Sequence, residues 1–230
     1  MAKKIDTILT NAAVLTMDEK LRQFNPGTVA VEADCIVDVG MADEIERKYS
    51  ADQIIDCNQK VLMPGLINTH THIPMTLLRG LADDLRLEVW LLGYVMPVER
   101  EFVSENFVRL GTQLGCVEFI RTGVTTFNDM YYFESVVAEA TAEMGLRAIC
   151  GQSILKFPTP DAKSSDDALQ LVRDMAAKYK GHPLIIPAIA PHAAYTCPPE
   201  LLKQATELAL ELDIRSEEHT SALQSRQVIS

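Results

Sequence analysis

The sequence is poor in the features that mark membrane, secreted and nucleic-acid-binding proteins. It has no apolar run of about 18 residues, so no transmembrane helix is predicted. Lys3 and Lys4 are followed by a broken apolar stretch, which is not the pattern of a signal peptide. The net charge is −11 and no basic stripe is present. Nucleic acid and anionic membranes are therefore not expected as partners.

Cysteine pairing is also absent from the sequence. None of the five cysteines stands in a C-x-x-C pair; they are Cys35, Cys57, Cys116, Cys150 and Cys197. This scatter predicts buried free thiols in a reducing compartment, the cytoplasm. No short-period repeat or low-complexity tract is found. With 230 residues, 47% of them hydrophobic, the chain can form a substantial core in one large domain or slightly more.

The first 60 residues are predicted to be mainly β-strands. Ile5 to Leu15 contains apolar residues typical of a strand, and Gln53 to Val61 is expected to be another. Thr28 to Val39 is rich in β-branched residues, and Glu32–Ala33–Asp34 is its predicted hairpin turn. Met41 to Lys48 is expected to form a short helix.

Beyond Val61 the pattern changes to alternating strands and helices, which predicts an α/β fold with a parallel sheet or barrel. After the first strand, further strands are expected at 124–127, 147–155 and 184–190, and a fifth begins at 213–214. Helices are expected at 105–121, 134–144, 166–180 and 198–212. Glu105 to Arg121 has an apolar stripe at helical spacing, and Gly123 is its predicted C-cap; the stripe comprises Phe107, Leu110, Leu114, Val117 and Ile120.

Two histidines stand at the end of the first of these strands. Leu66 and Ile67 are predicted to form a short buried strand, followed by His70 and His72. Residues two apart in a strand point to the same side, so both imidazoles can face one point. Neutral imidazole is a ligand for zinc, iron and nickel, and a catalytic metal commonly has about three protein ligands. The alternative is two polar residues that merely follow a strand, because H-x-H alone is a weak motif.

Four segments resemble one family. They read PGLINTHTHIPMTLLRG, EVWLLGYVMPVE, GVTTFNDMYY and PHAAYTCPPELL. This sequence resembles the amidohydrolase superfamily and, within it, the 5'-methylthioadenosine/S-adenosylhomocysteine deaminase family. The resemblance implies a partial TIM-like β/α barrel of about four units over residues 61–214. It also implies that residues 1–60 are the N-terminal part of a small β-sandwich.

The resemblance implies a hydrolase that acts on non-peptide C–N bonds of cyclic amidines. It would convert 5'-methylthioadenosine or S-adenosylhomocysteine to the inosine analogue and ammonia. One divalent metal is implied, zinc first with iron or nickel as alternatives, held by His70 and His72. Glu99 would bind the ribose hydroxyls, for which two carboxylate oxygens are suited, and His192 would contact the nucleoside. Trp90 is expected in the core or in a pocket wall, with ligand stacking as a further role.

Each of these roles has a plainer alternative. Glu99 could be a solvated carboxylate in the first turn of a helix, and His192 a structural histidine. Asp129 is predicted to follow the second strand and cap the next segment. Gln152 departs from the family, in which some relatives have a substrate-contacting arginine. The catalytic acid–base carboxylates, implied after strand five and at the end of strand eight, have no counterpart in this chain.

The last 16 positions break the pattern. Arg215 to Ser225 resembles the conceptual translation of a sequencing adapter, differing at Ala222. Residues 215–230 are therefore expected to be a non-native tail, and a genuine divergent tail is the alternative. Two other functions are kept open: an amidohydrolase acting on an s-triazine, guanine or another ring amine, and a truncated, non-catalytic fragment. A homo-oligomer of the full-length parent is also left open.

Overall fold

The computed structural model describes residues 2–216. The chain divides into two compact units, Met1–Gly65 and Leu66–Ser230, and each is described by itself. Among the described residues, no helix is both long and apolar enough to cross a membrane. The five cysteines are free thiols. Cys116, Cys150 and Cys197 are buried as predicted, but Cys35 is exposed and Cys57 is half-buried.

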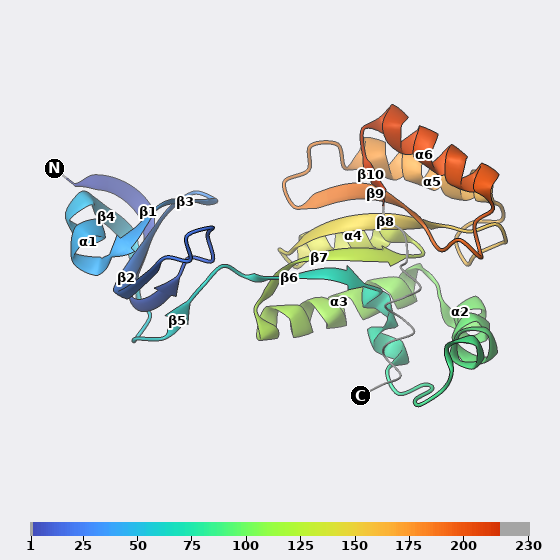
Figure 1. The fold of residues 1–230 in the computed structure, drawn as a ribbon, viewed down its shortest axis with the longest axis horizontal. Helices are drawn as coiled ribbons and strands as arrows, with labels where there is room; N and C mark the ends of the chain where they lie inside the picture. Colours follow the sequence, from blue (N-terminus) through green and yellow to red (C-terminus); the bar gives the residue numbers. More distant parts are fainter. Residues whose placement is uncertain (1, 217–230) are drawn as a thin grey trace. The chain divides into compact units, whose positions relative to one another are not determined.

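The N-terminal unit is a five-stranded sheet with one helix (Figure 1). Its elements are β1 (Lys3–Leu15), β2 (Gln23–Glu32), β3 (Cys35–Met41), α1 (Ala42–Lys48), β4 (Tyr49–Asp56) and β5 (Val61–Leu62). The strand order is β3-β2-β1-β4, and β5 also pairs with β1. The predicted hairpin is confirmed: β2 and β3 are antiparallel, and Ala33 has a positive φ in the turn. Ile5, Ile8, Ala30 and Ile45 form the core between the sheet and α1.

The second unit is a parallel sheet with helices in the connections (Figure 1). Its strands are β6 (Leu66–Thr71), β7 (Val124–Tyr131), β8 (Arg147–Ile154), β9 (Ile185–Pro191) and β10 (Arg215–Ser216), in the order β10-β9-β8-β7-β6. Its helices are η1 (Ile73–Leu78), η2 (Val89–Val95), α2 (Met96–Phe102), α3 (Glu105–Thr122), α4 (Glu134–Glu143), α5 (Ser165–Lys178) and α6 (Pro199–Leu212). The predicted alternation is confirmed.

The start of this unit differs from the prediction in two ways. Val61–Leu62 pairs with β1, so the segment up to Gly65 lies with the N-terminal unit rather than with the parallel sheet. Leu66 and Ile67 were predicted to be buried, but they are 49% and 67% exposed. The physical reason is that β6 is an edge strand of the sheet, whose only partner among residues 2–216 is β7.

Helix α3 begins where predicted, ends one residue later than predicted and has the predicted cap, but a different set of its residues packs against the rest of the unit. Gly123 caps it with a φ of 82°, as expected for glycine at a helix end. The predicted apolar stripe is largely exposed instead, at Leu110, Leu114, Val117 and Ile120. The face that contacts η1 contains Gly111 and Gly115, where an added Cβ would collide with Pro74 and Ile73. The inner face of α3 combines this close backbone approach at two glycines with the buried side chains of Val108 and Cys116.

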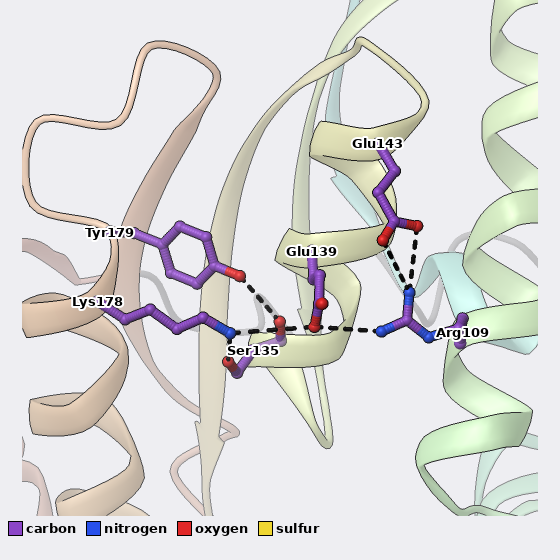
Figure 2. Close-up of polar contacts among 6 residues, drawn as sticks. All are labelled: Arg109, Ser135, Glu139, Glu143, Lys178 and Tyr179. Atoms are coloured by element: carbon purple, nitrogen blue, oxygen red, sulfur yellow. Dashed lines mark hydrogen bonds and ion pairs between the residues drawn. The ribbon is translucent and has the colours of Figure 1, made fainter.

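Neighbouring helices on the outside of this unit are joined by ion pairs. Figure 2 shows Arg109 of α3 pointing at two glutamates of α4. Its guanidinium nitrogens lie 3.1 Å from Glu139 and 3.2 Å from Glu143. Lys178 of α5 reaches the same helix at Ser135, 3.2 Å from its hydroxyl. These polar contacts connect three consecutive helices outside the sheet.

The end of the described chain continues the sheet. Arg215 and Ser216 pair with Ala188 and Ile189 of β9 in parallel register. The fifth strand therefore includes two residues that were assigned to the non-native tail. The rest of that predicted tail, residues 217–230, lies outside the described residues.

Candidate active site

The two predicted metal-binding histidines come together at the carboxyl end of β6. His70 is in the strand and His72 precedes η1. Their ring centroids are 5.1 Å apart and their planes are nearly perpendicular, at 79°. The alternation of side chains along a strand accounts for this convergence, because the two residues are two apart.

The tautomer of His72 follows from its contact with β7. The Nδ1 atom of His72 lies 2.6 Å from the carbonyl oxygen of Met130. A carbonyl oxygen only accepts hydrogen bonds, so Nδ1 carries the proton and the lone pair is on Nε2. A backbone carbonyl that fixes the second ring nitrogen is the usual support of a metal-binding histidine. Nε2 of His72 is therefore the nitrogen suited to a metal.

Asp129 fixes the backbone next to the histidine pair. It lies inside β7, is fully buried, and accepts a 2.6 Å hydrogen bond from the Ile73 backbone N–H at Oδ1. The prediction that it follows the second strand and caps the next segment was wrong, because β7 runs on to Tyr131. The carboxylate instead supports the turn that follows His72, through Ile73, which lies 56 residues before Asp129 in the chain.

Glu134 is a second buried carboxyl near Asp129. Burial, followed by the negative charge of Asp129, raises the pKa of Glu134 well above its usual 4.5. Local sequence does not indicate a functional role for Glu134, because a glutamate in the first turn of a helix is usually solvated. Its burial depends on packing between α4 and the sheet, which local sequence does not show.

Glu99 is buried rather than solvated. It is in the first turn of α2 and is 5% exposed. The Tyr131 hydroxyl donates a 2.8 Å hydrogen bond to Glu99 Oε1. Burial raises the pKa of Glu99 to about 7, and the hydrogen bond from Tyr131 opposes that rise. The plainer alternative of a surface carboxylate is therefore wrong.

Tyr131 is a functional candidate that the sequence alone did not indicate. It ends β7, two residues after Asp129, so the two side chains leave the strand on the same side. Its ring centroid is 6.4 Å from that of His72. Because alternate residues of a strand share one side, the position of Tyr131 two residues after Asp129 would have indicated it. That inference requires knowing that β7 extends beyond Phe127, where the predicted strand ended.

His192 follows β9 and is held on two sides. Its backbone N–H donates to the Ile154 carbonyl, and its Nδ1 lies 2.9 Å from the Thr196 hydroxyl. Burial lowers the pKa of His192 to about 4, so the ring is neutral at pH 7. A neutral imidazole at the carboxyl end of a parallel strand can donate or accept one hydrogen bond to a ligand.

Trp90 and Gln152 occupy other parts of this region. Trp90, in η2, is half-buried and lines a hollow of about 390 Å³ together with Met75, Arg79 and Val95. Gln152 is buried, and its amide donates to Asp161 Oδ2 at 2.9 Å. The uncharged amide of Gln152 therefore holds the loop after β8.

Strand topology brings most of these groups to one edge of the sheet. His70, Tyr131 and His192 lie at or just beyond the carboxyl ends of parallel strands β6, β7 and β9, where barrel enzymes have their active sites. The paired imidazoles fit part of a zinc site. No group of three or more potential metal-binding side chains is found in residues 2–216. A third protein ligand is therefore not supplied by the described part of the chain.

A parallel β/α sheet with two histidines at the end of its first strand is the arrangement expected of the first part of a β/α barrel that holds a metal at the carboxyl ends of its strands. Residues 61–229 match the model of the amidohydrolase family, and the chain belongs to this family. The family is metal-dependent.

Curated relatives match most of this chain but only half of their own length. The 5-methylthioadenosine/S-adenosylhomocysteine deaminase of Thermodesulfovibrio yellowstonii is 45% identical over 210 residues, which are 90% of this chain and 48% of the relative. The enzyme of the same name from Aquifex aeolicus is 43% identical, with 91% and 46% covered. The chain thus spans about half the length of the curated relatives that it matches.

Solved structures show the same coverage. An adenosine deaminase from Xanthomonas campestris with bound zinc is 35% identical and has a TM-score of 0.93, with 96% of this chain and 50% of that chain covered. A guanine deaminase from E. coli has a TM-score of 0.77 at 19% identity, with 96% and 54% covered. The second likeness concerns the fold alone.

Proposed function

We propose that the complete protein containing this chain is a metal-dependent aminohydrolase of adenosine-type nucleosides. Its substrates would be 5'-methylthioadenosine and S-adenosylhomocysteine, and its products the inosine analogue and ammonia. The observation that carries this proposal is the buried carboxyl of Glu99, hydrogen-bonded to Tyr131, whose ring is 6.4 Å from that of His72. A carboxylate is suited to a ribose diol, and the tyrosine that donates to this carboxyl lies next to a histidine of a pair suited to a metal.

Each candidate residue has a distinct role in this proposal. His70 and His72 would hold one divalent ion, zinc by analogy with the Xanthomonas campestris structure, with iron and nickel as alternatives. When bound, such an ion lowers the pKa of water toward about 7. Glu99 would accept hydrogen bonds from the ribose hydroxyls.

His192 and Trp90 would contact the rest of the nucleoside. His192 is neutral at pH 7 because burial lowers its pKa to about 4, so its imidazole can form a hydrogen bond without a charge. Trp90 would form the wall of the adjoining hollow. Gln152 and Asp161 hydrogen-bond to each other at the end of β8, and neither side chain carries a positive charge. We give neither residue a role in binding the nucleoside.

Deamination also needs proton transfer by carboxyl groups. By family resemblance these follow the fifth strand and end the eighth, and they would come from the other half of the fold. We therefore assign no acid–base residue to this chain, which alone would be inactive. The free thiols support a reducing cytoplasm as its location.

The second candidate is a related amidohydrolase acting on another ring amine. Triazine hydrolase from Arthrobacter aurescens shares the fold at 19% identity and a TM-score of 0.84. That likeness supports the fold and not the substrate. The buried Glu99 favours a nucleoside, because a triazine or free guanine has no diol.

A hybrid enzyme tests the proposal. Residues 1–216 are joined to the remaining C-terminal part of the Thermodesulfovibrio yellowstonii relative, and ammonia release is measured. 5'-Methylthioadenosine, S-adenosylhomocysteine, adenosine, guanine and a triazine are compared. We expect kcat/KM to be highest for one of the first two. A preference for guanine or the triazine would contradict the proposed substrate class.

The hybrid also tests the role of Glu99. The Glu99→Ala variant should raise KM for nucleosides strongly while the zinc content stays near that of the parent hybrid. A matching loss of zinc would instead assign Glu99 to the metal site. Residues 1–230 alone serve as the negative control, for which no ammonia release is expected.

A further inference from the structure

The last two residues of β7 contact both halves of the candidate site. The carbonyl of Met130 accepts the hydrogen bond from His72 Nδ1, and the next residue, Tyr131, donates to Glu99. The metal-binding strand and the helix with Glu99 are therefore connected through adjacent residues of one strand. β7 is itself paired on both sides, with β6 and β8.

The contact between Tyr131 and Glu99 is buried at both ends. Tyr131 is 4% exposed and Glu99 is 5% exposed. A hydrogen bond to a carboxylate is strong when water is excluded, because few other donors compete. Among residues 2–216, this is the hydrogen bond that fixes the Glu99 side chain. It involves Oε1, and the second oxygen, Oε2, is not needed for it.

Helix α2 continues directly from η2 and holds the backbone of Glu99, but the helix alone does not fix the direction of the glutamate side chain. A glutamate side chain has three rotatable bonds, and ordering it costs conformational entropy. The hydroxyl of Tyr131 removes that freedom before a ligand arrives, which is the general basis of preorganised binding.

We propose that Tyr131 is a positioning residue: its hydroxyl holds the Glu99 carboxylate in place for a ligand's vicinal diol, at a fixed distance from the histidine pair. This inference rests on the proposed function. Tyr131 does not touch the reacting atoms, and its effect is on the binding of the ribose. Its hydroxyl should therefore matter for a nucleoside with both hydroxyls and not for one that lacks them.

The test compares two substrates in the hybrid enzyme. Tyr131→Phe removes only the hydroxyl. We expect KM for adenosine to rise roughly tenfold or more, the usual effect of losing a hydrogen bond to a charged group, with little change in kcat. For 2',3'-dideoxyadenosine, both constants should match those of the parent hybrid.

Two further variants separate positioning from general packing. Tyr132→Phe, at the next position, removes a hydroxyl that is not bonded to Glu99, and it should change the two substrates equally. With Glu99→Gln already present, Tyr131→Phe should add little to KM for adenosine, because both changes act on one contact. Independent, additive effects would overturn the inference, as would an equal rise in KM for both substrates.

A spectroscopic measurement keeps the inference testable if the hybrid is inactive. The side-chain carboxyl carbons of glutamate are labelled with carbon-13, and the signal of Glu99 is identified by its loss in the Glu99→Gln variant. The chemical shift of this signal is then measured by NMR as a function of pH. In the Tyr131→Phe variant, which lacks the hydrogen bond, the titration midpoint of Glu99 should be higher than in the parent hybrid. An unchanged midpoint would refute the role of Tyr131. Absence of ammonia from every nucleoside, with the expected NMR change, would refute only the proposed function.

Discussion

The pH dependence of folding should reveal the buried state of Glu99. Burial raises its pKa from 4.5 to about 7, so between these values the folded chain binds more protons at this site than the unfolded chain. Stability from this group is therefore present below about pH 4.5 and is lost as pH rises through about 7. A pKa difference of one unit corresponds to about 1.4 kcal/mol of unfolding free energy. The rise from 4.5 to about 7 therefore gives a loss of about 3 kcal/mol of stability over this pH range.

Glu99→Gln isolates this effect, because the amide keeps the shape and has no charge at any pH. Relative to the parent chain, the variant should gain about 3 kcal/mol of unfolding free energy between pH 4.5 and 8. Other titrating groups, including Glu134, are present in both proteins and cancel in the difference. Urea unfolding followed by fluorescence of Trp90, the single tryptophan, reports on the unit that contains Glu99.

Glu101→Gln is the matched control, since Glu101 is on the same helix and is exposed. Its unfolding free energy should follow that of the parent chain across the pH range. The reasoning would be refuted if the difference between Glu99→Gln and the parent stayed constant with pH. That result would mean that Glu99 is ionised and well solvated in the folded chain.

Three further variants test the supports of the site and of the helix layer. Gly111→Ala should destabilise the chain by about 1–3 kcal/mol in urea unfolding, because its Cβ would collide with Pro74; a neutral effect would show that α3 can shift. Asp129→Ala should weaken zinc binding by the hybrid about 10- to 100-fold in a chelator competition, because the Ile73 N–H loses its acceptor; unchanged affinity would remove Asp129 from the metal support. Arg109→Ala should cost about 1 kcal/mol at low salt and less at high salt, since its ion pairs are partly exposed; a loss independent of salt would point to packing instead.

Local sequence determined the elements and the identity of the family. The alternation of apolar strands with capped helices predicted the parallel sheet, and Gly123 stands where α3 ends. The spacing of His70 and His72 predicted their convergence, because strand geometry alone puts residues two apart on one side. These predictions needed only local periodicity and short motifs.

Tertiary structure decided what is buried and what each polar group contacts. The apolar stripe of α3 suggested its inner face, yet close packing at Gly111 and Gly115 turns a different face inward. Glu99 looks like any first-turn glutamate in sequence, and its raised pKa arises from burial beside Tyr131, 32 residues away. Burial and pairing depend on contacts between distant segments, and side-chain type at one position does not encode them. The sequence thus determined which residues could form the site, and the fold determined which of them meet.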